Sequence, residues 1–456
     1  MKSPVSLHVV VALMGASLLP RAVAAQPAPD AEPIPLVEVY GTLVPFLEYG
    51  HTTSATPPGT HTPNMDSASQ VAAAAYTGVN LPARANMDPS TTNIGFRGGV
   101  ELMPNLSVVW QIENAVPIDG SAGANTFASR NTNVGLTGNW GTFFYGNWDT
   151  PYSWITKTTM NPIRSGNITD YNAIINNPGF GVASVTTQPT RAAGPADAAW
   201  ERRQGNEVQY WTPNINGVSA RFMYSIDEGR TAATAMAPQI GPSMLSAAIA
   251  VDIGPIKLRE AAEVHFDYFG MSQLGGTPVS NTNRSSTDWG NKVIAQYTNP
   301  LKGMETRVLG IAEFLSYKND ETTAGANNAY SRWAAYGLIE QALGKHRVWV
   351  GAGKAFEGSC EKVAGPMVPD CITTGLSATD VVVGYIFRAS KSFDIWAAYY
   401  RISNDFASNH TSSPALGAVP APGTIIEAFG VGMLYTFSAK IIGPPAKAAA
   451  APAPPP

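Results

Sequence analysis

The stretch Leu106-Ser107-Val108-Val109-Trp110-Gln111-Ile112-Glu113 decides the fold class of this chain. Its first, third, fifth and seventh residues are apolar, and most of the others are polar. Successive side chains of a strand point to opposite faces, so this segment has one apolar and one polar face. Similar segments of about ten residues recur from about residue 36 to Phe437, separated by tight turns or loops. The repetition predicts an all-β protein.

The N-terminus has the features of an export signal. Lys2 supplies a positive charge, residues 5–19 are mostly apolar, and Ala22-Val23-Ala24-Ala25 adds small residues. Because this stretch is too short to span a bilayer as a helix, we expect residues 1–25 to be a cleaved signal peptide. No later run approaches the ~18 apolar residues of a spanning helix. An exported chain of alternating strands predicts a transmembrane barrel with lipid outside and water inside.

The composition supports this prediction. Charged residues make up 14% of the chain, and the chain contains 43 glycines, whereas a soluble protein carries about 25% charge. Half of each strand must face lipid in a barrel, which lowers the charged fraction without creating long apolar runs. The formal net charge is −4. Basic runs are lacking and the aromatic residues are scattered, so we expect no nucleic-acid partner.

Counting the alternating segments gives an even number, as bacterial barrels require. We expect sixteen strands, joined alternately by short turns and long loops, with both termini on the periplasmic side. The expected strands are roughly 36–49, 92–102, 105–115, 128–138, 140–149, 204–213, 217–226, 243–253, 256–268, 288–299, 304–317, 329–342, 346–357, 378–388, 392–403 and 424–437. The barrel would thus occupy residues 36–437, after a Pro-rich linker at 26–35. An Ala/Pro-rich disordered tail would follow at 438–456.

Several segments resemble the Gram-negative general porins. Val37-Glu38-Val39-Tyr40-Gly41-Thr42-Leu43 is similar to the first strand of that family. The hairpin from Asn93-Ile94-Gly95-Phe96-Arg97-Gly98 to Glu113 resembles its second hairpin. Gly430-Val431-Gly432-Met433-Leu434-Tyr435-Thr436-Phe437 resembles its closing strand. The order and spacing of these segments cover nearly the whole mature chain.

The resemblance implies a homotrimer of sixteen-stranded barrels, integral to the outer membrane, through which ions and small hydrophilic solutes diffuse passively. The loop after the fifth strand, residues 150–204, would fold into the lumen and narrow it. Lipid, lipopolysaccharide and the barrel-assembly machinery would be further partners. At about 55 residues, this loop is also too long for an ordinary connection.

The period of two places charged side chains inside the barrel. The apolar residues next to Arg97 and Arg221 are expected to face lipid, so both arginines are expected to face the lumen. Arg130 lies just before the fourth strand, near the rim. Channels sort solutes with charged rings and constrictions. The pore constriction candidates are therefore three wall residues and three residues on or next to the long loop: Arg97, Arg130, Arg221, Asp149, Asp170 and Glu201.

The chain departs from the family pattern at three places. Gln209 stands where the family often has arginine on the sixth strand, and Gly146-Asn147 replaces a Gly-Arg pair. The family usually ends at its closing aromatic residue, a signal for barrel assembly, whereas nineteen residues, Ser438 to Pro456, follow Phe437 here. The first two differences leave ion preference open.

The two cysteines, Cys360 and Cys371, lie close together in a loop-like stretch. In an exported protein such a pair predicts a structural disulfide. A metal site would need further ligands, and this stretch contains no histidine. We therefore expect neither a metal nor another cofactor.

Sequence motifs of enzymes are missing. The chain has no His-Glu-x-x-His, no Gly-x-Ser-x-Gly and no phosphate-binding loop. His265 and Asp267 would share a strand face without an evident nucleophile. Two alternatives to a general diffusion channel stay open: a channel selective for anions, organic acids or sugars, and an outer-membrane enzyme.

Overall fold

The computed structural model describes residues 37–59, 76–120, 127–157, 159, 162–163, 173–176, 200–226, 241–268, 285–301, 303–320, 322, 324–325, 327–366, 370–411, 416 and 420–442. The expected signal peptide, the expected linker and the residues after 442 lie outside these ranges. Within them, no helix is long and apolar enough to cross a membrane.

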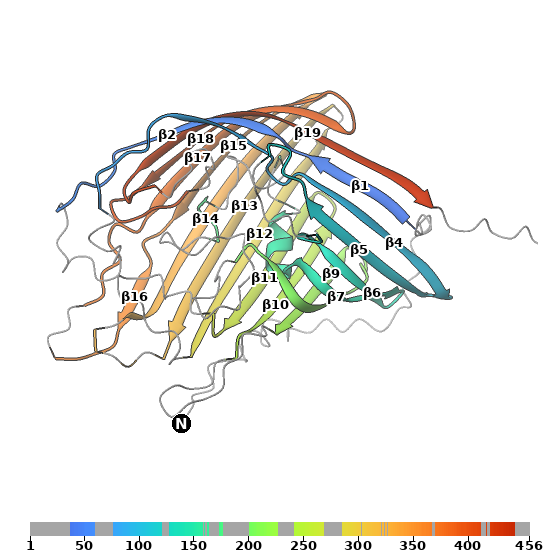
Figure 1. Cartoon of the computed structure of the whole chain (residues 1–456), viewed down its shortest axis with the longest axis horizontal. Helices are drawn as coiled ribbons and strands as arrows, with labels where there is room; N and C mark the ends of the chain where they lie inside the picture. Colours follow the sequence, from blue (N-terminus) through green and yellow to red (C-terminus); the bar gives the residue numbers. More distant parts are fainter. Residues whose placement is uncertain are drawn as a thin grey trace, which may run out of the picture.

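The strands form one antiparallel sheet that closes into a barrel (Figure 1). In chain order they are β1 (Val37–Leu43), β2 (Phe46–Thr53), β3 (Arg84–Asp88), β4 (Asn93–Met103), β5 (Leu106–Ala115), β6 (Thr132–Gly138), β7 (Gly141–Asp149), β8 (Arg203–Trp211), β9 (Val218–Ile226), β10 (Ser243–Ile253), β11 (Ile256–Phe266), β12 (Ser286–Leu301), β13 (Met304–Asn319), β14 (Asn327–Leu343), β15 (His346–Ala355), β16 (Ser359–Lys362), β17 (Ala378–Arg388), β18 (Phe393–Asn404) and β19 (Ile425–Ile442). β1 pairs with β19, and this pairing closes the sheet. Closure removes the exposed edges that an open sheet would present.

Three strands of the wall are each broken once, so the nineteen segments make a sixteen-stranded barrel. β1 and β2 both pair with β19 and are separated by Val44 and Pro45. Pro45 has no N–H to donate, so a break in the ladder is expected there. β3 and β4 pair with β2 and β1 in turn, and β15 and β16 both pair with β14. The predicted antiparallel sixteen-stranded fold is confirmed.

Several strands extend beyond their expected bounds. β19 continues to Ile442 instead of ending at Phe437, because β1 starts at Val37 and supplies backbone partners as far as Ile442. The strand expected at 92–102 starts earlier, at Arg84, because β2 offers a further ladder to β3. Five residues that we expected in the tail therefore belong to the barrel wall.

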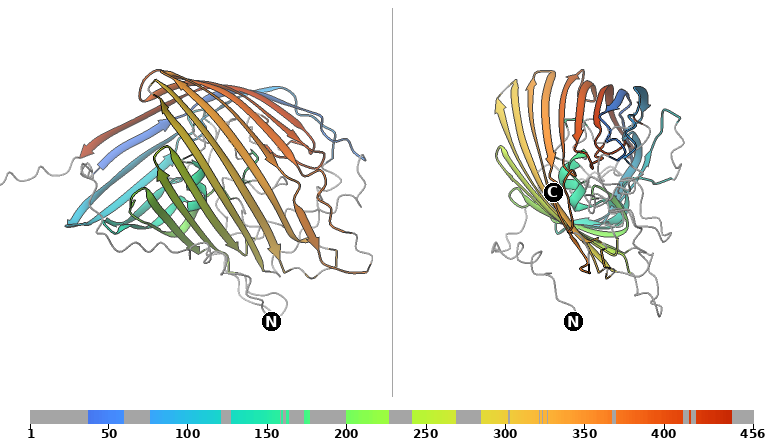
Figure 2. Two further views of the ribbon diagram at one scale, coloured as in Figure 1. Left: turned by 180° about the vertical axis from the view of Figure 1, so that it is seen from behind. Right: turned by 90° about the vertical axis from the view of Figure 1, so that its left-hand side faces the viewer.

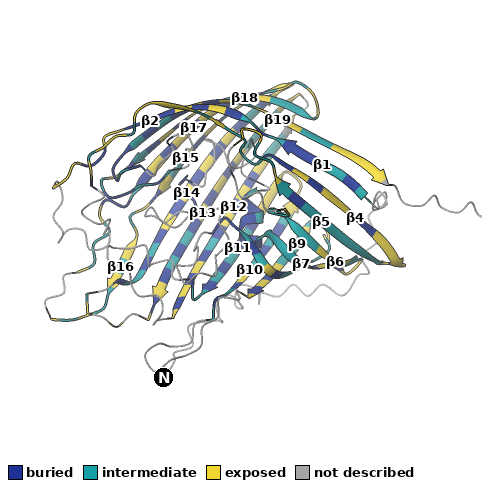
Figure 3. Cartoon of the chain, viewed as in Figure 1, coloured by how far each residue is buried: buried dark blue, intermediate teal, exposed yellow. Residues whose placement is uncertain are grey.

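Exposed and buried residues alternate along the strands, as Figure 3 shows. On β14, Trp333 and Ile339 are 57% and 52% exposed, whereas Glu340 is 1% exposed and faces inward. On β5, Val108 lies opposite Val100 and Leu136, whose side chains are exposed on the outside. The barrel is thus apolar outside and polar inside, as the period of two predicted.

The barrel wall is uneven in height. β12 and β13 have 16 residues each and β14 has 17, whereas β6 has 7 and β7 and β8 have 9 each. Figure 2 shows the long strands on one side of the molecule and the short ones opposite.

Seven tight or short connections gather at the end where Val37 pairs with Ile442. Two of them use glycine with positive φ, Gly254 at 55° and Gly344 at 58°, which an L side chain would strain.

Part of the chain between β7 and β8 lies inside the barrel. The short helix α2 (Pro151–Lys157) packs against β10, β11 and β12. In the right-hand view of Figure 2, strands enclose α2 on both sides. Tyr152, Ile155 and Trp200 are fully buried in this region. The buried core inside the barrel therefore lies against one side of the wall. On the opposite side, the wall presents polar side chains to the interior.

Candidate functional site in the barrel interior

Helix α2 begins immediately after the wall strand β7. The backbone N–H of Ser153 donates to Thr150 Oγ1 at 3.2 Å, which makes Thr150 the N-terminal cap. Pro151 occupies the first helical position, where its missing N–H costs nothing. The sequence Asp149-Thr150-Pro151 thus turns the chain from the wall into the interior.

One lysine on the wall contacts three separate parts of the in-folded segment. Lys292 on β12 donates to Thr156 on α2 at 3.2 Å, to Asn176 Oδ1 at 3.0 Å and to Glu201 Oε1 at 2.6 Å. Its ammonium also lies 3.8 Å from the ring centre of Tyr152. The Lys292 side chain is fully buried. A buried cation with four such partners fixes the in-folded segment against β12.

A second set of contacts extends this anchor across the next two strands. Glu313 on β13 accepts from the Tyr152 hydroxyl and from the Asn176 backbone N–H, each at 2.7 Å. Arg332 on β14 lies 3.9 Å from Glu313 and donates to the Ile174 carbonyl at 3.0 Å. Both side chains are fully buried. The long-strand side of the barrel therefore holds the in-folded segment through charged residues.

Glu201, one of the predicted residues, belongs to this anchor. Its carboxylate accepts from Ser153 Oγ at 2.8 Å, from Thr156 Oγ1 and from Lys292. It is 5% exposed. Next to it, the indole of Trp200 donates to the Tyr317 hydroxyl at 2.9 Å and stacks on His265 at 4.2 Å. Glu201 thus holds the segment in place and does not face open solvent.

The opposite wall carries two local ion pairs. Arg97 on β4 binds Glu38 on β1 at 3.0 Å, directly across the strand pair. Arg130 binds Glu113 on β5 at 2.6 Å, and the Tyr40 hydroxyl donates to the same carboxylate at 3.0 Å. Both predicted arginines therefore face inward, and each is paired with a carboxylate of the wall.

Asp149 joins the wall to the in-folded segment. Its carboxylate accepts from Lys157 at the end of α2 at 2.5 Å and from Asn131 at 2.9 Å, and it lies 3.5 Å from Arg203. These contacts hold both ends of α2 near the end of β7. The predicted acidic residue is therefore in the site, with two cations beside it.

Arg221 has a different environment from the other predicted arginines. Its guanidinium carbon lies 3.8 Å from the ring centres of both Trp154 on α2 and Trp211 on β8. It forms no ion pair or hydrogen bond with any residue that the structure describes. Stacking between two indoles holds a cation through the negative faces of their π systems.

Asp170 lies outside the described residues. The other five predicted residues lie in or around the interior. Asp149 interacts electrostatically with both Arg130 and Arg221, whereas Glu201 binds Lys292. Arg97 and Arg130 contact wall carboxylates, Glu201 contacts β12, and Arg221 contacts aromatic rings.

The main anchors of the in-folded segment are Lys292, Glu313 and Arg332, none of which was predicted from the sequence. Each is flanked by residues that face outward, such as Val293, Phe314 and Trp333. The period of two on these strands would have placed all three inside the barrel. It would not have identified their partners, which come from distant parts of the chain.

A cavity of about 710 Å³ lies beside this anchored segment. Arg307 on β13 donates to the Thr159 carbonyl at 2.7 Å and pairs with Glu340 on β14. Arg347 on β15 binds the same carboxylate. Lys257 on β11 also lines the cavity. Its lining is therefore polar and charged, as an aqueous passage requires.

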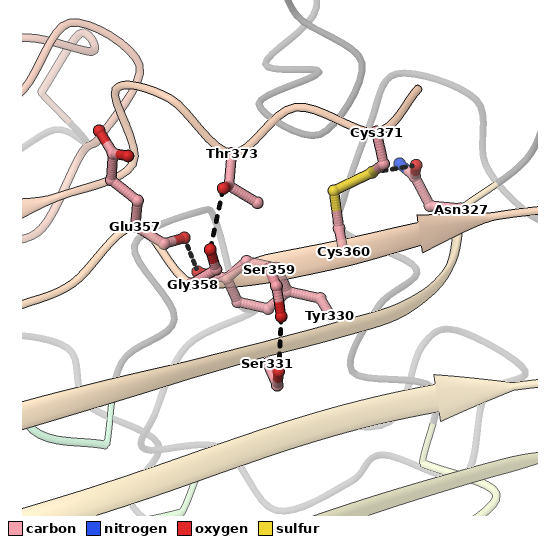
Figure 4. Close-up of a disulfide and its surroundings, with 9 residues drawn as sticks. All are labelled: Asn327, Tyr330, Ser331, Glu357, Gly358, Ser359, Cys360, Cys371 and Thr373. Carbon is pink, nitrogen blue, oxygen red and sulfur yellow. Dashed lines mark hydrogen bonds between the residues drawn. A yellow bond between two sulfur atoms is a disulfide. The ribbon is translucent and has the colours of Figure 1, made fainter. Parts of the chain in front are cut away.

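Cys360 lies on β16 and Cys371 lies in the connection that follows it, and both pack against the buried core. Cys360 and Cys371 form a disulfide with their Cα atoms 5.7 Å apart (Figure 4). Near it, Tyr330 donates to the Glu357 carbonyl at 3.1 Å and Thr373 donates to the Gly358 carbonyl at 3.0 Å. The connection is thus fastened to the end of β14.

A family model for the Gram-negative porin matches residues 10–441. The chain belongs to the Gram-negative porins. Its fold is similar to that of an anion-selective porin from Comamonas acidovorans, with a TM-score of 0.59 and 17% identity over 88% of this chain and 99% of the other. It is also similar to OmpT of Vibrio cholerae in its trimer form, with a TM-score of 0.52 and 12% identity over 88% and 99%. No curated protein sequence gives a significant match.

The family and the barrel together establish the general role of this porin. It is an integral outer-membrane protein that forms a channel for small solutes. The channel fold points away from an enzyme. The charged interior is then the surface that permeating solutes meet.

Proposed function

We propose that this porin is a general diffusion channel, narrowed on one side by the segment between β7 and β8. The observation that carries the proposal is the anchoring of that segment by Lys292 to the long-strand wall. A segment fixed to one wall leaves the passage along the wall of β1, β4 and β5. Solutes would pass it by size and charge without a conformational step.

Weak anion preference is part of this proposal. On the wall from β1 to β9, Glu38, Glu113 and Asp149 are each neutralised by at least one cation. Arg221 adds a positive charge without a carboxylate partner among the described residues. Glu48 and Glu207 on the same wall are fully buried, so the proposed preference rests on the half-buried Arg221, whose positive charge favours anions over cations of the same size.

Assembly and export follow the family in this proposal. Residues 1–25 act as the signal peptide, and the mature chain forms a homotrimer in contact with lipid and lipopolysaccharide after insertion by the barrel-assembly machinery. The trimeric Vibrio protein supports self-association. The tail after residue 442 would extend into the periplasm.

We propose no catalytic activity. The described residues contain no group of three or more potential metal ligands among His, Cys, Asp and Glu. Ser408 and His410 do share a hydrogen bond of 2.7 Å, but both are fully buried beside Asn404. A buried pair of this kind secures a loop and offers no surface to a substrate.

Single-channel recording of the purified protein in a planar bilayer tests the proposal. We expect conductance to rise in groups of three equal steps, one for each subunit. In a salt gradient, the reversal potential should have the sign of a channel that passes anions more readily than cations. Folded protein that inserts but passes no current would overturn the channel. A reversal potential of the opposite sign would overturn only the anion preference.

A further inference from the structure

The two indoles that contact Arg221 come from different parts of the fold. Trp211, which lies opposite Arg221 across the β8–β9 pair, donates from its indole to Gln209 Oε1 at 2.8 Å. The Trp211 ring also contacts Phe144 edge-on, at 4.9 Å between centroids. Trp154 approaches the other face of the guanidinium from α2. One aromatic wall is therefore fixed by the barrel, and the other by the in-folded helix.

The stacking leaves one kind of contact available to this cation. A guanidinium carries five N–H donors in its plane, and both of its faces are covered by indoles. No described residue accepts from those N–H groups, whereas Arg97 and Arg130 each bind a carboxylate. The half-buried edge is thus a set of oriented donors without a protein acceptor in the described chain.

We propose that Arg221, between Trp154 and Trp211, is a binding site for small organic carboxylates, with planar aromatic acids bound best. The proposal deepens the channel function and rests on it. A carboxylate matches the planar fork of the guanidinium with two parallel hydrogen bonds. The ligand lies in the guanidinium plane, so the indole edges flank its body and favour an apolar, flat one. Inorganic anions gain only the charge contact.

The site predicts saturable block of the channel by such acids. Potassium chloride current through the wild-type porin is recorded while benzoate, acetate or inorganic phosphate is added. We expect benzoate to reduce the current at lower concentration than acetate or phosphate. Arg221→Met removes a charge-assisted pair of hydrogen bonds and should raise the half-blocking benzoate concentration about tenfold or more.

Two further variants make the result specific. Arg401→Met deletes the same charge from the outward face of β18, so benzoate block should be unchanged. Arg221→Lys keeps the charge and loses the planar fork, so benzoate block should weaken several-fold. Benzoate binding to the detergent-solubilised wild-type porin, followed by calorimetry, gives a measurement that does not depend on any variant folding.

The outcomes separate the site from the channel. A wild-type porin without potassium chloride current fails as a channel, and the calorimetric titration still reports on the site. Normal current with benzoate block unaltered by Arg221→Met or Arg221→Lys would overturn the site. Phosphate acting as strongly as benzoate would overturn the ligand class, as would calorimetry without saturable benzoate binding.

Discussion

Lys292 is the residue whose loss should change the pore most. Lys292→Met keeps the length of the side chain and removes the cation that Glu201, Asn176 and Thr156 share. Breaking a buried ion pair costs about 3–5 kcal/mol, because the remaining charge stays buried without its partner. Ser153 and Thr156 still donate to Glu201, so we take the lower end. A cost of about 3 kcal/mol shifts the docked population of the segment roughly 150-fold.

Single-channel recording reports this shift directly. The Lys292→Met channel should show larger or fluctuating conductance, because the segment leaves the wall for part of the time. The double variant Lys292→Met, Glu201→Gln removes both charges. Its conductance should return to nearly the wild-type value, with most of the added current noise removed. Lys257→Met, which removes a lysine that lines the interior cavity, controls for lost lumen charge and should leave current noise unchanged. Wild-type conductance and noise in Lys292→Met would refute the anchoring role.

Three other substitutions have defined outcomes. Glu260 on β11 faces outward opposite Val293, and the Asn291 side chain donates a hydrogen bond to it at 3.5 Å. Because a carboxylate that faces the hydrocarbon is costly, Glu260→Leu should stabilise the barrel in lipid by about 1–2 kcal/mol. Denaturant titration measures this change. Replacing Cys360 and Cys371 by serine opens a bridge that spans 11 residues and should loosen that connection by about 3 kcal/mol, seen as faster tryptic cleavage after Lys362. Glu113→Gln leaves the Arg130 charge unpaired and should move the reversal potential further toward anions in a salt gradient.

Each of these has a control. Lys318 lies at the outer end of β13, and charges cost less near the membrane interface, so Lys318→Leu should change stability little. If Lys318→Leu stabilised the barrel as much as Glu260→Leu, the prediction for Glu260 would be wrong. Tryptic cleavage of the wild type after reduction should match the serine variant. Glu427→Gln removes an acid from the outward face, so an equal shift of the reversal potential there would contradict the role of Glu113.

The sequence predicted the barrel because its periodic signal depends only on neighbours along the chain. The β5 stretch that alternates apolar and polar residues alternates outward and inward in the structure. Tight turns such as the one with Gly344 set the strand boundaries. The end of β19 was misplaced, since Ile442 is held by pairing with Val37, which lies about four hundred residues away. Pairing at that distance leaves no local signal.

The sequence predicted the barrel interior only in part, because the contacts there also join residues that are far apart in the chain. A period of two can place Arg97, Arg130 and Arg221 inside a barrel, but it cannot tell which of them meets a carboxylate. The partners Glu38 and Glu113 come from other strands, and the indoles around Arg221 come from α2 and β8. This difference bears on selectivity, because a paired arginine presents little net charge to a passing ion. The ion preference of this porin should therefore depend less on how many arginines face the pore than on Arg221, which forms no ion pair or hydrogen bond among the described residues.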